Sequence, residues 1–114
     1  MLDHEKLDVY QCSTEFLALS YDLLETIPRG HSLIADHLKR ASLSIPFNIA
    51  EGSGKTTVAD KGKYYAIARG SAMECGAVLD ACLVLKLIAI PQHSKGKALL
   101  VRIVSMLSKI CLQK

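Results

Sequence analysis

The chain of 114 residues is long enough to bury one hydrophobic core and too short for two, so we expect a single domain over residues 1–114. Half of the residues are apolar, only 5% are aromatic and Trp is absent, which favours a core of Leu, Ile, Val and Ala in an all-α protein. The net charge of +3 is unevenly placed, because residues 1–30 carry −4 and the remainder carries +7. The N-terminus is polar and acidic, unlike a signal peptide, and the longest apolar stretch is shorter than the ~20 residues of a membrane span. We therefore expect a cytoplasmic protein without a membrane segment.

A first helix is predicted between Leu7 and Ile27, and it should end at Pro28 and Gly30. Its apolar residues recur at steps of three and four, as one buried face of a helix requires. These residues are Val9, Cys12, Phe16, Leu19 and Leu23.

A second helix is predicted from Ser32, read as its N-cap, to the Gly52-Ser53-Gly54 sequence. Pro46 lies inside this span. Proline removes one backbone donor and crowds the carbonyl of Ser42, so we expect a kink there unless the helix breaks.

A third helix should start at Thr57, because Thr57 and Asp60 have the spacing of a capping box. Pro91 would close this helix near Ile90. Close approach of a neighbouring helix would explain Gly70. The predicted core positions alternate steps of four and three: Tyr64, Ala68, Ser71, Cys75, Val78, Cys82 and Leu85.

A fourth helix is predicted from about Ser94, with apolar residues at Leu99, Ile103, Met106 and Ile110. Short connections make adjacent helices antiparallel. The sequence therefore predicts an antiparallel up-down-up-down four-helix bundle, with one long crossover as the alternative topology.

Two sequence blocks carry a family resemblance. Residues 40–55, RASLSIPFNIAEGSGK, resemble the signature R-A-x-x-S-I-P-x-N-I-A-E-G-x-x-R/K of the four-helix-bundle proteins encoded in intervening sequences of 23S ribosomal RNA genes. Residues 64–74, YYAIARGSAME, resemble the second block of that family, which contains A-x-G-S-x-x-E. The stretch from Asp60 to Lys63 departs from the family, whose members often place a glutamate and an aromatic pair there.

The resemblance implies an assembly and a class of partner. It implies a homopentamer in which five copies form a closed ring. It also implies kinship with the accessory protein of diversity-generating retroelements, a basic pentamer that works with a reverse transcriptase and nucleic acid.

The polar residues of these blocks predict a structural hydrogen-bond network. An unmatched buried polar group costs ~1–3 kcal/mol, so such side chains should find partners. We expect Asn48 and Glu51 to bond around Pro46 and Gly52, with Ser71 or Glu74 opposite. The full candidate set is Arg40, Ser44, Asn48, Glu51, Ser71 and Glu74.

No catalytic or metal-binding pattern stands out. The four His residues form no H-x-x-x-H or H-E-x-x-H spacing, and the four Cys residues form no C-x-x-C pair. Glu51 and Glu74 have no His near them in sequence that would support acid–base catalysis. We therefore expect a non-enzymatic protein with no cofactor and no metal.

The leading functional prediction is an oligomeric protein that associates with RNA or DNA through a basic surface. Repetition of weak basic patches around a ring would strengthen the binding of a polyanion. The candidate residues are Lys55, Lys61, Lys63, Arg69, Lys95, Lys97 and Arg102. An ordinary solvated lysine face explains the same residues equally well.

The alternative prediction is a protein-interaction scaffold, an accessory subunit for a reverse transcriptase or an RNA-processing enzyme. Its acidic first helix would dock a basic partner through Glu15, Asp22 and Glu25.

Overall fold

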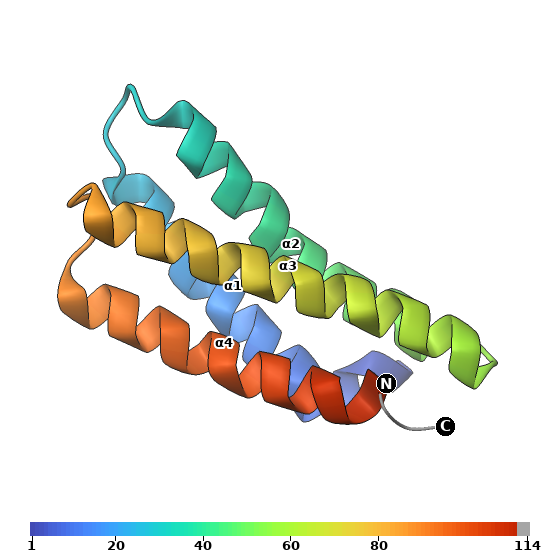
Figure 1. Ribbon diagram of the computed structural model, residues 1–114. Coiled ribbons are helices and arrows are strands. Elements are labelled where there is room, and N and C mark those ends of the chain that lie inside the picture. Colours follow the sequence, from blue (N-terminus) through green and yellow to red (C-terminus); the bar gives the residue numbers. More distant parts are fainter. Residues whose placement is uncertain (112–114) are drawn as a thin grey trace.

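The computed structural model describes residues 1–111 as four helices and a short 3-10 helix; the last three residues lie outside this part (Figure 1). After the 3-10 helix η1 (Asp3–Lys6), each helix packs against its sequence neighbours and α4 returns to α1. The helices are α1 (Asp8–Thr26), α2 (Ser32–Ser53), α3 (Val58–Val84) and α4 (Ile90–Cys111). The all-α, antiparallel up-down-up-down bundle is therefore confirmed. None of the helices within residues 1–111 is long and apolar enough to cross a membrane.

One core runs through the bundle and is made mainly of aliphatic side chains. Phe16, Leu38, Ile49, Leu79 and Ile103 are fully buried, and together they come from all four helices. α1 and α3 lie diagonally across the bundle, and their backbones do not approach each other closely. The outer surface of α3 therefore faces away from α1.

The α1–α2 connection depends on Gly30, whose φ of +100° is a conformation that side chains disfavour. The Ser32 cap prediction was wrong. Ser32 is the first residue of α2, and the preceding His31 offers no side-chain hydrogen bond to the free amides.

α2 continues through Pro46 without a break. The proline ring is buried in the bundle, so packing compensates for the backbone hydrogen bond that proline cannot make. α2 ends at Ser53 with Gly54 as its C-cap, so the predicted Gly52-Ser53-Gly54 sequence does end the helix, although Gly52 itself is still helical. Its role is a close approach: a Cβ at Gly52 would lie 2.8 Å from Cε1 of Tyr65 and 3.2 Å from the Lys61 carbonyl oxygen.

The start of α3 confirms the predicted cap. The Thr57 hydroxyl oxygen accepts a hydrogen bond of 3.1 Å from the Asp60 backbone amide. Asp60 lies in the first turn, where a carboxylate favours the positive end of the helix dipole.

The predicted end of α3 near Ile90 was wrong. Lys86 has a φ of +60°, the Leu87 amide donates to the Cys82 carbonyl at 2.8 Å, and the Lys86 amide donates to the Leu83 carbonyl at 3.0 Å. This hydrogen-bond pair is a Schellman motif, which ends the helix at Val84.

The predicted start of α4 near Ser94 was also wrong. α4 begins at Ile90, so Pro91 lies in its first turn, where no intrahelical donor is lost. The Gln92 side chain accepts a hydrogen bond of 2.8 Å from the Ala89 amide and caps the start.

The buried face of α3 differs from the prediction. Ala68, Cys75, Val78 and Cys82 are buried as expected, but Tyr65, Ala72 and Leu79 replace Tyr64, Ser71 and Leu85. The buried residues keep a seven-residue repeat at Ala68, Cys75 and Cys82, but the second set of positions, Tyr65, Ala72 and Leu79, lies one residue later than predicted.

Gly70 is exposed and has no atom of the chain within 4 Å of a Cβ position, so no helix of its own bundle approaches it. The close contacts are made at Gly52 and at Gly96, which faces Leu79.

Candidate interaction surfaces

The α2–α3 seam holds a short ladder of hydroxyl and amide groups. Ser44 Oγ and Ser71 Oγ lie 2.7 Å apart and join the two helices. Asn48 Nδ2 donates to Ser44 Oγ at 3.0 Å and to the Ser44 carbonyl at 2.8 Å. All three side chains are half-buried. The ladder therefore satisfies polar groups that the seam removes from water.

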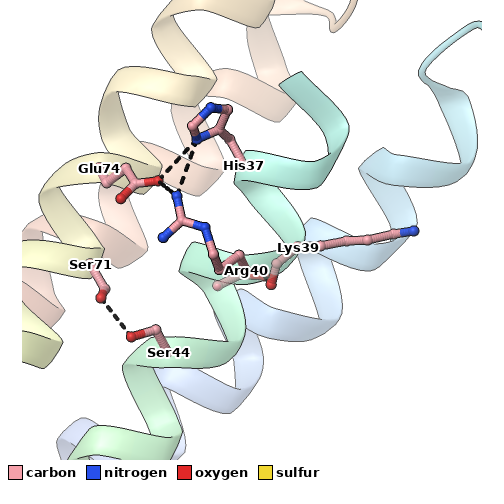
Figure 2. Close-up of polar contacts among 7 residues, drawn as sticks. His37, Lys39, Arg40, Ser44, Ser71 and Glu74 are labelled. Atoms are coloured by element: carbon pink, nitrogen blue, oxygen red, sulfur yellow. Dashed lines mark hydrogen bonds and ion pairs between the residues drawn. The ribbon is translucent and has the colours of Figure 1, made fainter. Parts of the chain in front are cut away.

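One turn further along the seam lies an ion pair between Arg40 and Glu74 (Figure 2). Arg40 Nη2 donates to Glu74 Oε2 at 2.7 Å. His37 Nδ1 lies 3.4 Å from the same carboxylate oxygen and 3.2 Å from Arg40 Nη2. Figure 2 shows these side chains bridging α2 and α3, whereas Lys39 points away from them.

Five of the six candidate network residues thus lie in two neighbouring clusters, and Glu51 lies in neither. Glu51 is exposed and forms an ion pair with Lys55 at 3.5 Å, one turn along α2. Lys55 also approaches Tyr64 at the start of α3, with its Nζ lying 5.1 Å from the ring centre.

Three of the seven basic candidates gather at the α2–α3 turn. Lys61 Nζ donates to the Ser53 carbonyl at 2.9 Å, and Lys63 Nζ lies 5.9 Å from the centre of the Tyr64 ring. Together with Lys55 they surround a turn that extends beyond the ends of α1 and α4 (Figure 1).

The other four basic candidates are spread over two sides of the bundle. Arg69 Nε donates to Ser108 Oγ at 2.8 Å, and Lys97 Nζ lies 2.9 Å from Asp80 Oδ1, so both bridge α3 and α4. Arg102 lies on the α1 side, near Cys12. Burial raises the pKa of Cys12, and the positive charge of Arg102 opposes this rise. Lys95 is exposed. The seven residues do not form one continuous surface.

The outer surface of α3 carries a row of uncharged residues, which the prediction missed. The uncharged residues exposed in this row are Ala59, Ala66, Gly70, Met73, Ala77 and Val84. The row is free of charge from Ala66 to Ala77, and the exposed Lys63 and Asp80 lie in it on either side of that part. Beside this stripe a groove of about 380 Å³ runs between α3 and α4, with Val101 63% exposed at its edge. The sequence contained the signal, because these six positions hold no charge while their neighbours do.

A second apolar patch lies on the α1–α2 side. Leu17 and Tyr21 are one turn apart on α1, and they line a shallow groove with Leu43 of α2. Phe47 follows Leu43 by one turn and is 64% exposed. We call this set the α1–α2 patch, and the set on the outer surface of α3 the α3 stripe. They lie on different sides of the bundle because α1 is diagonal to α3.

The thiols are held as packing groups. Burial raises the pKa of Cys75 to about 12, with a further increase from the neighbouring Glu74 carboxylate and a smaller opposing effect of Arg40. Burial also raises the pKa of Cys82. Thiolate is the nucleophile and the metal ligand, so these two thiols are unreactive near neutral pH. Across residues 1–111, no three His, Cys, Asp or Glu side chains are grouped to hold a metal ion.

The comparisons with known proteins agree with this fold. The family model described as 23S rRNA-intervening sequence protein matches residues 5–109. A crystal structure of a protein of unknown function from the S23 ribosomal protein family of Bacteroides thetaiotaomicron VPI-5482 superposes with a TM-score of 0.85. It is 21% identical, and the match covers 92% of this chain and 99% of the other. No protein with a curated description matches the sequence.

Proposed function

The chain belongs to the 23S rRNA-intervening sequence protein family, and we propose that it is a non-enzymatic, self-associating protein that binds nucleic acid. Copies of the bundle join head to tail into a ring of five. Each copy then presents its basic α2–α3 turn at the same end of the ring.

Self-association is supported mainly by the α3 stripe. Its exposed residues include Met73 at 56% and Val84 at 78%, over a helix of 27 residues. The uncharged part of the stripe from Ala66 to Ala77 is roughly 17 Å long at 1.5 Å per residue, and soluble monomers rarely expose a large apolar surface. The small side chains at Ala66, Gly70 and Ala77 allow another helix to approach closely.

We propose head-to-tail contact between copies because the bundle carries two different apolar surfaces, the α3 stripe and the α1–α2 patch, on different sides. An interface between the α3 stripe of one copy and the α1–α2 patch of the next is heterologous, and repetition of such an interface gives a ring when the rotation between copies closes after a whole number of copies. Charge supports this pairing. Two acids lie beside the α1–α2 patch, since Asp22 follows Ala18 by one turn and Glu25 follows Tyr21 by one turn. Arg69 lies one turn from Met73 of the α3 stripe and could pair with them.

Nucleic-acid binding is assigned chiefly to the α2–α3 turn. Lys55, Lys61 and Lys63 gather there, and the turn projects beyond its neighbouring helices (Figure 1). Lys97 contributes less because Asp80 neutralises it. Five copies of the turn would hold a polyanion that a single copy binds weakly.

The test of self-association is the molar mass of the wild type and of Met73→Glu, measured by light scattering during size-exclusion chromatography. The wild type should have the mass of five chains. The variant should elute as a folded single chain, because the interface would have to bury an unpaired carboxylate. Ser94→Glu, which adds the same charge at an exposed position of α4 outside the stripe, should remain a pentamer. A monomeric wild type would refute the ring.

The test of binding is retention of RNA by a triple variant with Lys55, Lys61 and Lys63 changed to Glu. Retention by the wild type should fall steeply between low and moderate salt, and the variant should lose it while keeping the mass of the assembly. A matched triple variant with Lys95, Lys97 and Arg102 changed to Glu should retain more RNA. A wild type that binds neither RNA nor DNA at low salt contradicts this part of the proposal.

The accessory-scaffold alternative is favoured by one observation, the exposed acids Glu15, Asp22 and Glu25 on α1. A basic protein partner docked there would bind a monomer as well as a ring. Changing all three acids to Lys in the monomeric Met73→Glu variant would then abolish partner binding, and loss of the ring could not explain that result.

A further inference from the structure

We infer that Tyr64, with Lys55 and Lys63, forms a stacking site for an unpaired base of single-stranded nucleic acid. The inference rests on the proposed nucleic-acid function and specifies its ligand. It concerns an aromatic residue that charge patterning alone does not single out.

Tyr64 lies outside the core, unlike its neighbour. The ring of Tyr65 is buried against Gly52, but Tyr64 is half-buried at the α2–α3 turn. Its ring is approached by the ammonium groups of Lys55 at 5.1 Å and Lys63 at 5.9 Å from the ring centre. The ring therefore contacts flexible, charged side chains from two elements, which can move aside for a ligand.

Lys63 brings a positive charge to the Tyr64 ring, and the exposed Asp60 lies one turn before Tyr64 on α3. Glu51 pairs with Lys55 at 3.5 Å, whereas Lys63 is exposed and has no acidic partner within 4 Å in the described residues. Lys61, two residues before Lys63, uses its ammonium group to bind the Ser53 carbonyl. A phosphate next to Tyr64 would relieve the repulsion between the lysines and leave the ring face to the attached base.

A single strand fits this arrangement and a duplex does not. In a duplex the base faces are stacked on one another, so a protein reaches only phosphates and base edges. An unpaired base offers its face to an aromatic side chain while lysines contact the flanking phosphates. The combination of one accessible ring and two lysines therefore points to single-stranded RNA or DNA.

The experiment measures fluorescence anisotropy of a labelled oligouridine and of a labelled RNA duplex, with the wild type and three variants. Tyr64→Ala should weaken binding of the single strand roughly tenfold or more, with little change for the duplex. Tyr64→Phe keeps the ring and should bind within about twofold of the wild type. The Lys55→Gln, Lys63→Gln double variant should reduce the salt dependence of binding, by about 0.7 in log–log slope for each phosphate that the two lysines no longer neutralise.

The outcomes separate the inference from the proposed function. If Tyr64→Ala binds oligouridine as tightly as the wild type, the stacking site is refuted even though nucleic-acid binding stands. If the wild type binds neither probe, the proposed function fails first. Thermal unfolding of each variant shows whether weaker binding reflects an unfolded chain, and Tyr64→Phe provides the rescue if Tyr64→Ala unfolds.

Discussion

Gly52 and Gly62 show how the same residue type has different roles at two positions ten residues apart. A side chain at Gly52 would enter the space between α2 and the Tyr65 ring, next to the Lys61 carbonyl. A side chain at Gly62 would meet nothing within 4 Å. The first glycine allows two helices to pack closely, whereas the second only lowers the helix propensity of α3.

Alanine at these positions should therefore have opposite effects. Gly52→Ala should lower the free energy of unfolding by ~1–3 kcal/mol, because the ring or the helix must shift. Gly62→Ala should raise it by ~0.5–1 kcal/mol, because alanine restricts the unfolded chain and favours the helix. Urea denaturation of both variants checks this, and equal shifts in the same direction would contradict the packing explanation.

Lys86, just after the C-terminus of α3, has a left-handed backbone conformation. This region costs a non-glycine residue ~1–2 kcal/mol, and a helix that ends in a Schellman motif usually places glycine there. Lys86 holds the position because Leu87 and Ile88 beyond it pack against the core.

Lys86→Gly should stabilise the protein by up to ~1 kcal/mol, since the relief of strain exceeds the added freedom of the unfolded chain. Lys86→Ala is the matched control, because it removes the charge and keeps the strain. Denaturant midpoints should rise for the glycine variant and stay unchanged or fall for alanine. A gain with alanine would show that charge, and not backbone conformation, limits stability here.

Asp80 joins α3 to α4 through Lys97 at 2.9 Å and His93 at 2.8 Å. The hydrogen bonds from Lys97 and His93 lower the pKa of Asp80, and partial desolvation opposes them. A carboxyl group with a lowered folded-state pKa stabilises the fold above its unfolded pKa, near 3.9, and loses this contribution as pH falls through the folded value.

Asp80→Asn should therefore cost up to ~1 kcal/mol at pH 6, the scale of an exposed ion pair. The difference in free energy of unfolding between wild type and variant should shrink toward zero below pH 4. Denaturation at several pH values measures it. A difference that stays constant down to pH 2 would assign the loss to packing instead of charge.

The helix ends that carry glycine or a capping hydroxyl group were predictable from the sequence. The boundary between α3 and α4 was not. Gly30 and Thr57 mark the α1–α2 turn and the start of α3 because their chemistry matches their local conformation. Lys86 carries no such signal, and Pro91 indicates a helix end and a first helical turn equally well. Tertiary packing of Leu87 and Ile88 decided between the two interpretations.

The candidate network was predictable as a set of residue types but not in its pairing. Ser44, Asn48 and Ser71 meet because α2 and α3 pack antiparallel in one particular register. The local sequence of either helix does not determine that register. Glu51 is exposed and pairs with Lys55 one turn along α2, so it does not join the network.

At the scale of the whole molecule, association should be visible in stability. If the pentamer is favoured over the monomer, the midpoint of thermal unfolding should rise with protein concentration, because assembly stabilises only the folded chain. Met73→Glu should have a midpoint that does not depend on concentration. Calorimetry over a hundredfold range of concentration tests this, and a wild-type midpoint that never moves would count against assembly.

In the assembly that we propose, the up-down order of the helices also separates folding from association in time. Each helix packs against the next one along the chain, and the contacts of α4 with α1 and of η1 with α2 join more distant parts of the sequence. Bundles dominated by such local contacts fold in microseconds to milliseconds. Association between copies depends on their encounter in solution and is slower at cellular concentrations. A newly made chain is therefore a finished bundle with its apolar stripe uncovered before it meets a second copy, and the interval between these events is when it is most exposed to aggregation.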